Sequence, residues 1–568
     1  MKSSTAKTSF TPHGGGIRGA DVRHQSSLFE GRFGRMFREL PPAVHAKSAL
    51  LSLGTAMTAD AEGAEDTPPK PKAAPETPEH IQDDEENSGI DAGYTYLGQF
   101  IDHDITFDPS SSLMQQNDPE SLVDFRTPRL DLDSLYGRGP ADQPYMYLGD
   151  KFRLGKHLLA DATPTPSRDL PRYHDPDDPD GKLRALIGDK RNDENVIVSQ
   201  LHSTFLQLHN RFVDDLRAGG ARFDDIQRLV RWHYQFVVLN DFLPRICGKK
   251  LIDELLPKRL THGTAAEKKP KIQFYHWRNS PFMPIEFAAA AYRFGHSMVR
   301  PIYRLNTKLK GGDDPNVATP DEKARGLEGR FFIFAGVARR GLNGFDEVPT
   351  QWAIDWSLFF DTDGSGAKGG KQRSQPAYKI DTSLVNPLGF LPEFSNVVKP
   401  SPPLTIEQLQ AKALDPVNDP ANLAARNLLR GLSMQLPSGQ AVARAMGEKV
   451  IPDKDLKVGK AVLEEMATAT SIVDIDKSFK DNAPLWFYIL AEAQNEWFKR
   501  ASKPFSHGNA EPVTLGPVGG RIVAETLIGL VWGDGHSYLQ QDPNWIPTVG
   551  GRTTTMGKLI KYALTGVK

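Results

Sequence analysis

One short apolar stretch of the chain brings together side chains that can transfer protons and bind ligands. Residues 98–109 contain the amide Gln99, the acids Asp102 and Asp104, and the imidazole His103. If the stretch is helical, Gln99 and His103 stand at i and i+4 on one face, and the two acids flank that face about 100° to either side. One face can then carry chemistry while the flanks bind other partners. Three consecutive side chains on a helix cannot converge on one ion, which argues against the alternative of a metal site built on residues 102–104 alone.

A second histidine lies in a segment bracketed by prolines. Pro284 suits a first helical turn and Pro301 suits a stop, so the pattern predicts a helix of about four turns over residues 284–301. Within it, His296 follows Gly295 and a run of alanines. Small residues let a flat group approach the backbone, so this histidine can present a nitrogen to a haem iron. A core histidine on a tightly packed helix is the alternative for this segment taken alone.

The composition limits the class of protein. The chain has 568 residues, 39% of them hydrophobic, with a formal net charge of -2. It therefore has a substantial core and no net basic field that would favour nucleic acid or an anionic membrane as the main partner. The single cysteine, Cys247, excludes an intramolecular disulfide and a thiolate cluster. With no signal-peptide pattern and no apolar run of membrane-spanning length, we expect a soluble protein that is cytoplasmic, or released without a recognisable signal peptide.

The chain divides into three parts by composition. Residues 1–54 are an N-terminal arm, residues 55–91 an acidic, proline- and alanine-rich linker, and residues 92–568 one catalytic domain. The periodicity in the domain is mostly helical, and strand signals are few, such as residues 330–334. Helices are predicted at residues 199–216, 223–246, 425–434, 461–468, 484–500 and 520–530. The sequence thus predicts a mainly α fold, a single large helical domain with few short strands.

Four separated motifs, taken in order, make the chain similar to the animal-type haem peroxidases. This superfamily contains the mammalian myelo- and lactoperoxidases and, more distantly, the cyclooxygenases. The resemblance covers roughly residues 92–530. The matching segments are the distal Gly-Gln-x-x-Asp-His-Asp at 98–104, the Arg-x-x-Glu at 191–194 with Leu-x-x-His-Asn-Arg at 206–211, the proximal Arg-x-Gly-His at 293–296, and Asn427 with Arg430 before Leu436 and Pro437.

The resemblance implies a fold, a cofactor and a role for each matched residue. The fold is the helical haem peroxidase domain and the cofactor is haem b. The implied catalytic residues are His103, Arg191 and Gln99, and the implied haem-binding residues are His296, Asn427, Asp102, Glu194 and Arg430.

In that arrangement two histidines act on opposite faces of the haem. His296 ligates the iron, while Asn427 accepts a hydrogen bond from the other ring N–H and makes the ligand more electron-rich. His103 takes a proton from hydrogen peroxide and returns it to the departing oxygen. Arg191 stabilises negative charge on the leaving oxygen, and Gln99 holds a distal water or small substrate.

The two acids beside these residues match those that form ester bonds to haem methyls in mammalian members. Covalent haem through Asp102 and Glu194 is therefore one expectation, and pairing of both acids with arginines is the alternative. Asn195 stands where the most oxidising member of the family has a haem-linked methionine. Asparagine cannot form that link, so chloride oxidation is not expected, whereas bromide, iodide, thiocyanate or organic donors are.

The resemblance also implies a calcium site. Its ligands are hard oxygens, the donors that Ca²⁺ prefers, and a solvated acidic loop is the alternative. The implied ligands are Asp104, Thr127, Arg129 through its carbonyl, Asp131 and Asp133.

The sequence therefore predicts a haem-dependent peroxidase whose partners are hydrogen peroxide and a small reducing substrate, with no protein partner identified. The first rival is a cyclooxygenase-like fatty-acid dioxygenase, which needs a tyrosyl radical three residues before the proximal histidine. Arg293 holds that position, and Tyr292 lies one residue off the register. The second rival is a non-enzymatic protein with degraded haem chemistry.

Overall fold

The computed structural model describes residues 31–59, 84–107 and 123–567, apart from gaps at 161–162, 175, 178–180, 182, 257–268, 279, 310–329, 334–340, 365–372, 392–414, 416 and 504–511. The predicted arm, residues 1–54, is thus described from residue 31 onward. Residues 60–83 of the predicted linker lie outside the described part.

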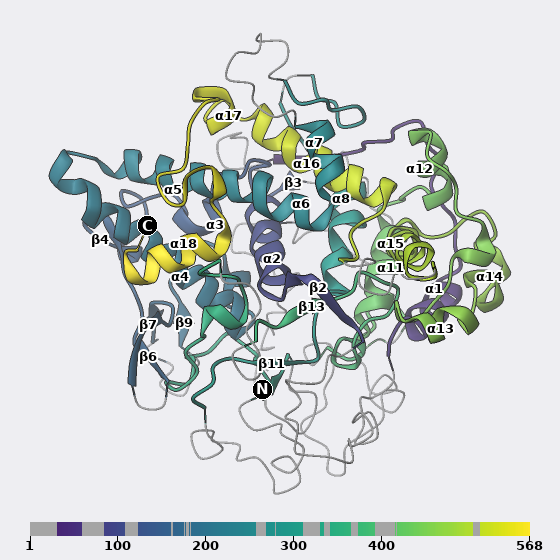
Figure 1. Ribbon diagram of the computed structural model, residues 1–568, viewed down its shortest axis with the longest axis horizontal. Coiled ribbons are helices and arrows are strands. Elements are labelled where there is room, and N and C mark those ends of the chain that lie inside the picture. Colours follow the sequence, from purple (N-terminus) through teal and green to yellow (C-terminus); the bar gives the residue numbers. More distant parts are fainter. Residues whose placement is uncertain are drawn as a thin grey trace, which may run out of the picture.

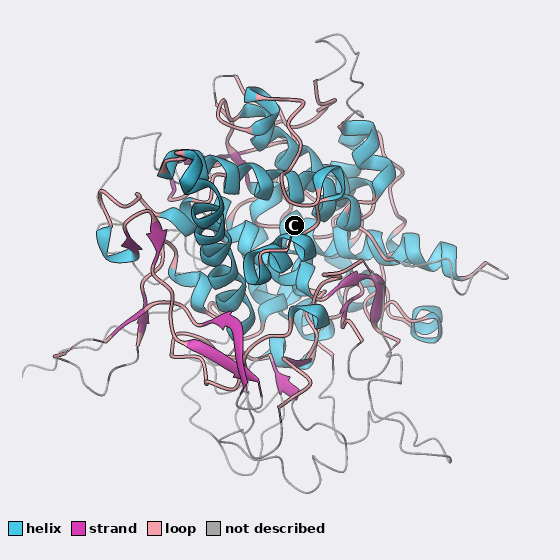
Figure 2. Cartoon of the chain, turned by 60° about the vertical axis from the view of Figure 1, so that its left-hand side comes forward, coloured by secondary structure: helices cyan, strands magenta, loops and turns pink. Residues whose placement is uncertain are grey.

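The protein is mainly helical, as predicted. Helices make up most of the molecule, and the strands are short (Figures 1 and 2). The α-helices of the described part are α1 (Lys47–Ala56), α2 (Gly93–Ile105), α3 (Asp133–Tyr136), α4 (Val196–Leu216), α5 (Phe223–Val237), α6 (Leu243–Ile246), α7 (Lys249–Leu255), α8 (Ile285–Ala288), α11 (Leu423–Ser433), α12 (Gly439–Met446), α13 (Leu463–Thr468), α14 (Ile472–Ile475), α15 (Leu485–Ala501), α16 (Pro517–Gly533), α17 (Tyr538–Gln541) and α18 (Met556–Thr565). Across these described ranges, every helix is too short or too polar to cross a membrane.

The strands pair in short ladders. β1 runs parallel to β10 and antiparallel to β3, and the other described strands pair as β2 with β13, β4 with β5, β6 with β7, β8 with β9 and β11 with β12. Ladders this short are not stable alone, so helix packing holds the fold together. Their bounds are β1 (Gly31–Gly34), β2 (Glu86–Asp91), β3 (Val123–Asp124), β4 (Tyr147–Leu148), β5 (Lys151–Phe152), β6 (His157–Ala160), β7 (Thr163–Arg168), β8 (Arg172–Tyr173), β9 (Arg184–Ala185), β10 (Met283–Pro284), β11 (Ile302–Arg304), β12 (Arg330–Phe332) and β13 (Pro376–Tyr378).

Helix α2 lies near the centre of the molecule and packs against α4 (Figure 1). Phe100 of α2 stacks on Phe205 of α4, with ring centroids 4.7 Å apart and planes 2° from parallel. Helix α4 is capped by Asn195, whose side-chain oxygen accepts hydrogen bonds from two backbone N–H groups of the first turn at 3.0 and 2.9 Å. This N-cap satisfies donors that have no partner inside the helix. The aromatic contact fixes the rotation of α2 about its axis and so the direction of its polar side chains.

The prediction of one continuous helix over residues 284–301 is wrong. Helix α8 ends at Ala288, the backbone leaves the helical region at Ala290 (φ -137°, ψ -74°), and a 3₁₀ segment, η8 (Ala291–His296), follows. In a continuous helix the Ala288 carbonyl would accept from the N–H four residues later. It accepts from Arg293 Nε instead, at 3.1 Å. A side-chain contact thus accompanies a break in a run of good helix formers.

The described part of the N-terminal arm is built into the protein core. Strand β1 pairs with β10, directly before α8. The backbone N–H groups of Met36 and Phe37 donate to the carboxylate of Glu286 in α8 at 2.9 and 3.1 Å, and Glu286 is completely buried. Phe33 and Phe37 belong to the same hydrophobic core as Phe100 of α2 and Phe205 of α4. The arm therefore holds the segment that leads to His296.

A second buried acid gives the stability a pH dependence. Glu492 of α15 accepts hydrogen bonds from the backbone N–H groups of Val518 and Gly519 at 3.0 and 3.2 Å, and burial raises its pKa from 4.5 to about 8. Between these values the folded protein keeps a proton that the unfolded chain loses. We therefore expect the free energy of unfolding to fall as the pH rises from about 4.5 to about 8.

The Glu492→Gln variant should lack this part of the pH dependence. Its urea midpoint should rise relative to that of the wild type as the pH increases from about 5 to about 8. Glu464→Gln, a change at an exposed side chain of α13, should follow the wild type. Equal pH slopes for the wild type and Glu492→Gln would contradict the expectation.

Candidate functional site

Gln99 and His103 extend from α2 toward the 3₁₀ turn η4 (Lys190–Asp193) and the residue after it. His103 is 2% exposed, and its Nδ1 lies 2.9 Å from Asn192 Oδ1. Its Nε2 lies 3.8 Å from Glu194 Oε1, and Gln99 Nε2 donates to the same carboxylate oxygen. The structure therefore brings together the predicted amide, imidazole and acid from two separate motifs.

Arg191 is anchored beside the backbone of His103. Its Nη2 donates to the His103 carbonyl at 3.0 Å and to Asp189 Oδ2 at 2.9 Å, and its guanidinium lies 4.5 Å from the ring centroid of Phe107. Burial by itself would raise the pKa of Asp189, but the charges of Arg191 and Arg126 outweigh it and hold that pKa well below its usual range. Asp189 is thus ionised and keeps the permanently charged guanidinium of Arg191 in the buried cluster.

Asn192 is a member of this cluster that the sequence analysis missed. It is completely buried, and its carbonyl oxygen is placed to accept a hydrogen bond from Nδ1–H of His103. A proton held on Nδ1 leaves Nε2 as the basic nitrogen. The only sequence signal is its position inside the Arg-x-x-Glu motif, one residue after Arg191.

Replacement of Asn192 tests this assignment. Asn192→Leu removes the acceptor, and we expect the reaction with hydrogen peroxide to slow roughly 10- to 100-fold, measured as the rate of the absorbance change on mixing. Asn192→Asp keeps an acceptor and adds a negative charge, so its rate should be largely retained while the acid limb of the pH profile moves to higher pH. Wild-type kinetics in both variants would show that Asn192 does not orient His103.

The two predicted ester-forming acids both lie beside this cluster. Asp102 is half-buried on the flank of α2, and its Oδ1 accepts from Thr106 Oγ1 at 2.9 Å. Burial raises the pKa of Asp102, and the charges of Arg191 and Arg293 oppose that rise. The side chain of Glu194 is 9% exposed. Both acids thus lie beside the cluster, Asp102 close to two arginines and Glu194 next to Gln99 and His103.

His296 and Asn427 meet although 131 positions separate them in the sequence. Asn427 Nδ2 lies 2.7 Å from His296 Nδ1, while Asn427 Oδ1 accepts from Arg293 Nη1 at 2.9 Å. This amide is turned opposite to the sequence expectation, because a guanidinium can only donate and takes the amide oxygen. Metal binding through Nε2 would put the proton on Nδ1, and the amide would then have to rotate about its Cβ–Cγ bond so that Oδ1 faces the ring.

The surroundings of His296 fit a haem. Gly295 and His296 are both half-exposed, and a Cβ added at Gly295 would meet no described atom within 4 Å. Open space beside an imidazole with an amide partner is what a flat, iron-containing ring needs. The half-buried Arg430 lies about one turn after Asn427 on α11, where a cation can meet a carboxylate of such a ring.

The segments that carry the two histidines pack against each other. Helix α2 contacts η8, and a Cβ added at Gly98 would lie 4.0 Å from Tyr292 Oη. That hydroxyl is buried and has no hydrogen-bond partner within the described ranges. The charge of Arg293 in η8 also acts on Asp102 of α2. The segment that carries His103 and the segment that carries His296 are therefore neighbours in the structure.

Three carboxylates form a candidate cation site next to α2. Oxygens of Asp104, Asp131 and Asp133 all lie within 4.8 Å of one another. Thr127 Oγ1 donates to Asp131 Oδ2 at 2.7 Å, so a fourth predicted ligand lies at the same place. Burial and the neighbouring carboxylates raise the pKa of Asp104 well above its usual range. A divalent cation would relieve this repulsion.

The loop around these carboxylates is strained. Leu132 adopts φ +62°, a left-handed conformation that is unusual for leucine, and its N–H donates to Asp104 Oδ2 at 3.2 Å. Burial raises the pKa of Asp133 to about 7 even though Arg126 lowers it. Arg129, half-buried in the same loop, donates its backbone N–H to the Thr127 carbonyl at 2.7 Å. A strained backbone conformation persists only where many surrounding contacts hold it, and such positions are common in ligand-binding loops.

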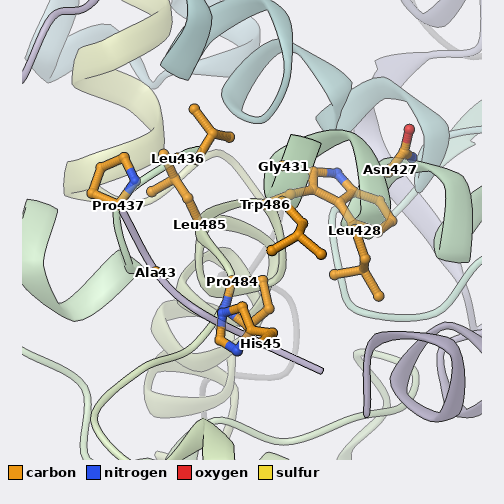
Figure 3. Close-up of a pocket in the computed structure, with 11 residues that line it drawn as sticks. Ala43, His45, Asn427, Leu428, Gly431, Leu436, Pro437, Pro484, Leu485 and Trp486 are labelled. Atoms are coloured by element: carbon orange, nitrogen blue, oxygen red, sulfur yellow. The ribbon is translucent and has the colours of Figure 1, made fainter. Parts of the chain in front are cut away.

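A small cavity lies next to Asn427 (Figure 3). It has about 20 Å³ of room for a water-sized sphere, which suits one water molecule and is far too small for a haem. At its edge stands His45 of the arm, which is 9% exposed, and neither of its ring nitrogens has a hydrogen-bond partner in the part of the chain that is described. Trp486 also lines the cavity and donates from Nε1 to the carbonyl of Arg293 at 3.2 Å. The arm therefore reaches the surroundings of the His296–Asn427 pair.

Comparison with known proteins identifies relatives for the central part of the chain. Residues 110–325 match the animal haem peroxidase family model. Over 133 residues the chain is 29% identical to the chorion peroxidase of Aedes aegypti, a match that covers 22% of this chain and 16% of that protein. Over 143 residues it is 27% identical to the eosinophil peroxidase of Mus musculus, covering 24% of this chain and 18% of that protein. The matches thus span less than a fifth of the length of these relatives.

A solved structure extends the similarity of fold to nearly the whole chain. Peroxidase A from Dictyostelium discoideum superposes with a TM-score of 0.51 at 14% sequence identity, and the match covers 94% of each chain. At this identity the match supports the fold and no finer property. It includes regions outside residues 110–325.

Proposed function

We propose that this chain, a member of the animal haem peroxidase family, is a haem-dependent peroxidase that reduces hydrogen peroxide by heterolytic O–O cleavage and oxidises a small donor. The observation that supports this best is the pair of amide-bound histidines on packed segments. Asn192 bonds to His103 on α2, and Asn427 bonds to His296 at the end of η8. Each amide orients one imidazole, as a proton-transfer base and a metal ligand both require.

In this proposal His296, Asn427 and Arg430 hold the haem. Haem b supplies an iron that binds peroxide and can accept its oxidising equivalents. Asn427 sets the direction of the His296 ring, and Arg430 bonds to a haem carboxylate. The open space at Gly295 leaves the ring room to approach the backbone.

The remaining residues move a proton and stabilise charge. His103 Nε2 accepts a proton from hydrogen peroxide and returns it to the oxygen that leaves as water, while Asn192 keeps the other proton on Nδ1. Arg191 stabilises the negative charge that develops on the departing oxygen. Gln99 binds a water or small substrate beside His103.

The donor in this proposal is a small organic molecule, bromide, iodide or thiocyanate. Asn195 caps α4 and its Nδ2 donates to Gln99 Oε1 at 3.1 Å. It therefore helps to orient the distal amide and carries no sulfur for a haem link. Peroxide-dependent oxidation of bromide without oxidation of chloride is the expected halide range.

Covalent attachment of haem is a separate part of the proposal. Asp102 and Glu194 flank the distal face, and each carboxylate can form an ester to a haem methyl when peroxide supplies the oxidising equivalents. The mass of the denatured chain should then increase by the mass of a haem after exposure to peroxide. The increase should disappear in the Asp102→Ala, Glu194→Ala double variant.

Calcium removal is expected to destabilise the protein. Asp104, Asp131 and Asp133, with Thr127 and the Arg129 carbonyl, are the proposed ligands, and the ion would tie α2 to the loop before α3. A cation present at about 100 times its Kd adds about 2.7 kcal/mol to the free energy of unfolding. Chelation should therefore lower the thermal midpoint, and added Ca²⁺ should restore it. An unchanged midpoint in the chelated wild type would remove calcium from the proposal.

The decisive experiment for the function is expression with haem supplied, followed by spectroscopy and donor oxidation. We expect a Soret band that changes on addition of hydrogen peroxide, and peroxide-dependent oxidation of a phenol. A protein that remains colourless after haem is supplied would refute the proposal. A haem-containing protein whose absorbance spectrum does not change on addition of hydrogen peroxide would also refute it and would favour the non-enzymatic alternative.

One observation keeps a fatty-acid dioxygenase as the second candidate. The buried hydroxyl of Tyr292 has no hydrogen-bond partner within the described ranges and lies next to Gly98 of α2. In this candidate Tyr292 would lose one electron and one proton and then abstract a hydrogen atom from a fatty acid, and a bound haem together with peroxide would supply the oxidising equivalent. Oxygen uptake with linoleate that is lost in Tyr292→Phe would favour this candidate, and the absence of uptake would exclude it.

A further inference from the structure

The N-terminal arm contacts the two segments that lead to His296 and carry Asn427. Strand β1 and the backbone N–H groups before residue 38 hold β10 and Glu286, which begin the segment ending at His296. Helix α1 packs on α11, the helix that carries Asn427 (Figure 1). The arm lies before the part of the chain that matches the family model.

The contact between α1 and α11 is as close as two backbones allow. A Cβ added at Gly54 would lie 2.7 Å from both Cα and N of Ala425, so neither helix can keep its position if Gly54 gains a side chain. Asn422, the N-cap of α11, donates from Nδ2 to Thr58 Oγ1 at 2.9 Å. Lys47 Nζ donates to Asn418 Oδ1 at 2.8 Å. The segment 47–58, which includes the end of the arm, thus fixes both the distance and the rotation of α11.

That rotation decides where Asn427 points. Ala425 and Asn427 are two residues apart, so they lie about 200° apart around the helix axis. Ala425 faces α1, and Asn427 faces His296 on the opposite side. Helix α11 is therefore held between the arm and the histidine, and a shift of the helix away from α1 displaces the Asn427 amide directly.

We infer that the N-terminal arm is a functional part of the proximal half of the site, with Gly54 as a positioning residue that sets the His296–Asn427 hydrogen bond. The inference rests on the proposed function. It predicts that enlarging Gly54 changes the electron donation of His296 to a bound iron without touching any residue that contacts the haem.

The experiment compares haem-loaded wild type with Gly54→Val. The readouts are the iron–histidine stretching frequency of the reduced protein and the rate of haem transfer to an excess of haem-free globin. We expect Gly54→Val to shift the stretch in the same direction as Asn427→Ala and to accelerate haem loss roughly 10-fold. Gly54→Ala should give a smaller shift in the same direction, and adding Ala425→Gly to it should not restore the wild-type value, because the new Cβ still meets the backbone N and Cα of residue 425.

Two controls separate positioning from general destabilisation. Ala56→Val adds a similar volume on the exposed face of α1 and should behave as the wild type. Leu559→Ala creates a cavity in α18, which should lower stability but leave the iron–histidine stretch unchanged. A stretch in Gly54→Val equal to that of the wild type, or an equal shift in Leu559→Ala, would overturn the inference. A wild type that binds no haem would instead refute the proposed function.

Discussion

The His103→Ala variant is expected to react with hydrogen peroxide roughly 10² to 10⁴ times more slowly than the wild type. The reason is that Nε2 of His103, with Nδ1 bonded to Asn192, is the basic nitrogen of the buried cluster. The rate is measured as the change of the Soret band on rapid mixing with peroxide. The variant should still bind haem, because His103 belongs to the opposite half of the site from His296.

The control for this prediction is an exposed histidine. His157→Ala changes an exposed residue of β6 and should leave the peroxide reaction unaltered. If His103→Ala reacts with peroxide as fast as His157→Ala, another group transfers the proton. The proposal that Asn192 orients His103 for this transfer would then also be wrong.

The second large effect is expected from His296→Gly, which should no longer hold haem as the wild type does. Removing the imidazole of His296 takes away the proposed iron ligand, while the space beside Gly295 stays open. Imidazole added to the buffer should enter this space, restore haem binding and bring back part of the spectrum. Haem content is measured by absorbance after gel filtration.

A comparison with Asn427→Ala sharpens this result. That variant keeps the ligand and loses only its partner, so it should retain haem with a weakened iron–histidine bond. Full haem binding by His296→Gly without imidazole would mean that a different residue holds the iron. The proximal assignment would then be wrong, although the distal cluster would be unaffected.

Local properties of the chain were readable from the sequence because they depend on near neighbours. The i and i+4 spacing of Gln99 and His103 predicts a shared helix face, and α2 spans both residues. The apolar periodicity after residue 199 predicts the helix that the structure shows as α4. The order of the four motifs predicts a resemblance to the animal haem peroxidases, and that family's model matches residues 110–325. The carboxylates at 104, 131 and 133 were predicted to meet and do so.

The geometry around those residues was decided by contacts between distant segments. Asn192 is an ordinary polar residue in the sequence and becomes a partner of His103 only because η4 packs against α2. The helix predicted over residues 284–301 is interrupted, and the side chain of Arg293 bonds to the Ala288 carbonyl at the break. The same arginine turns the Asn427 amide away from the expected direction. The bonds made by Asn192 and Asn427 have no signature in residue spacing, since each joins residues that are far apart in the sequence.

The sequence alone determined which chemical groups the protein has and which of them share a helix face, because helical geometry links residues three and four apart. Tertiary structure decided which nitrogen of each histidine is engaged and which segment supports it. The N-terminal arm shows the difference most clearly. Its composition suggested an appendage, whereas Gly54 and the N–H groups bonded to Glu286 make it a support of the proximal pair. Close backbone approach and buried hydrogen bonds depend on three-dimensional complementarity, which no local pattern encodes.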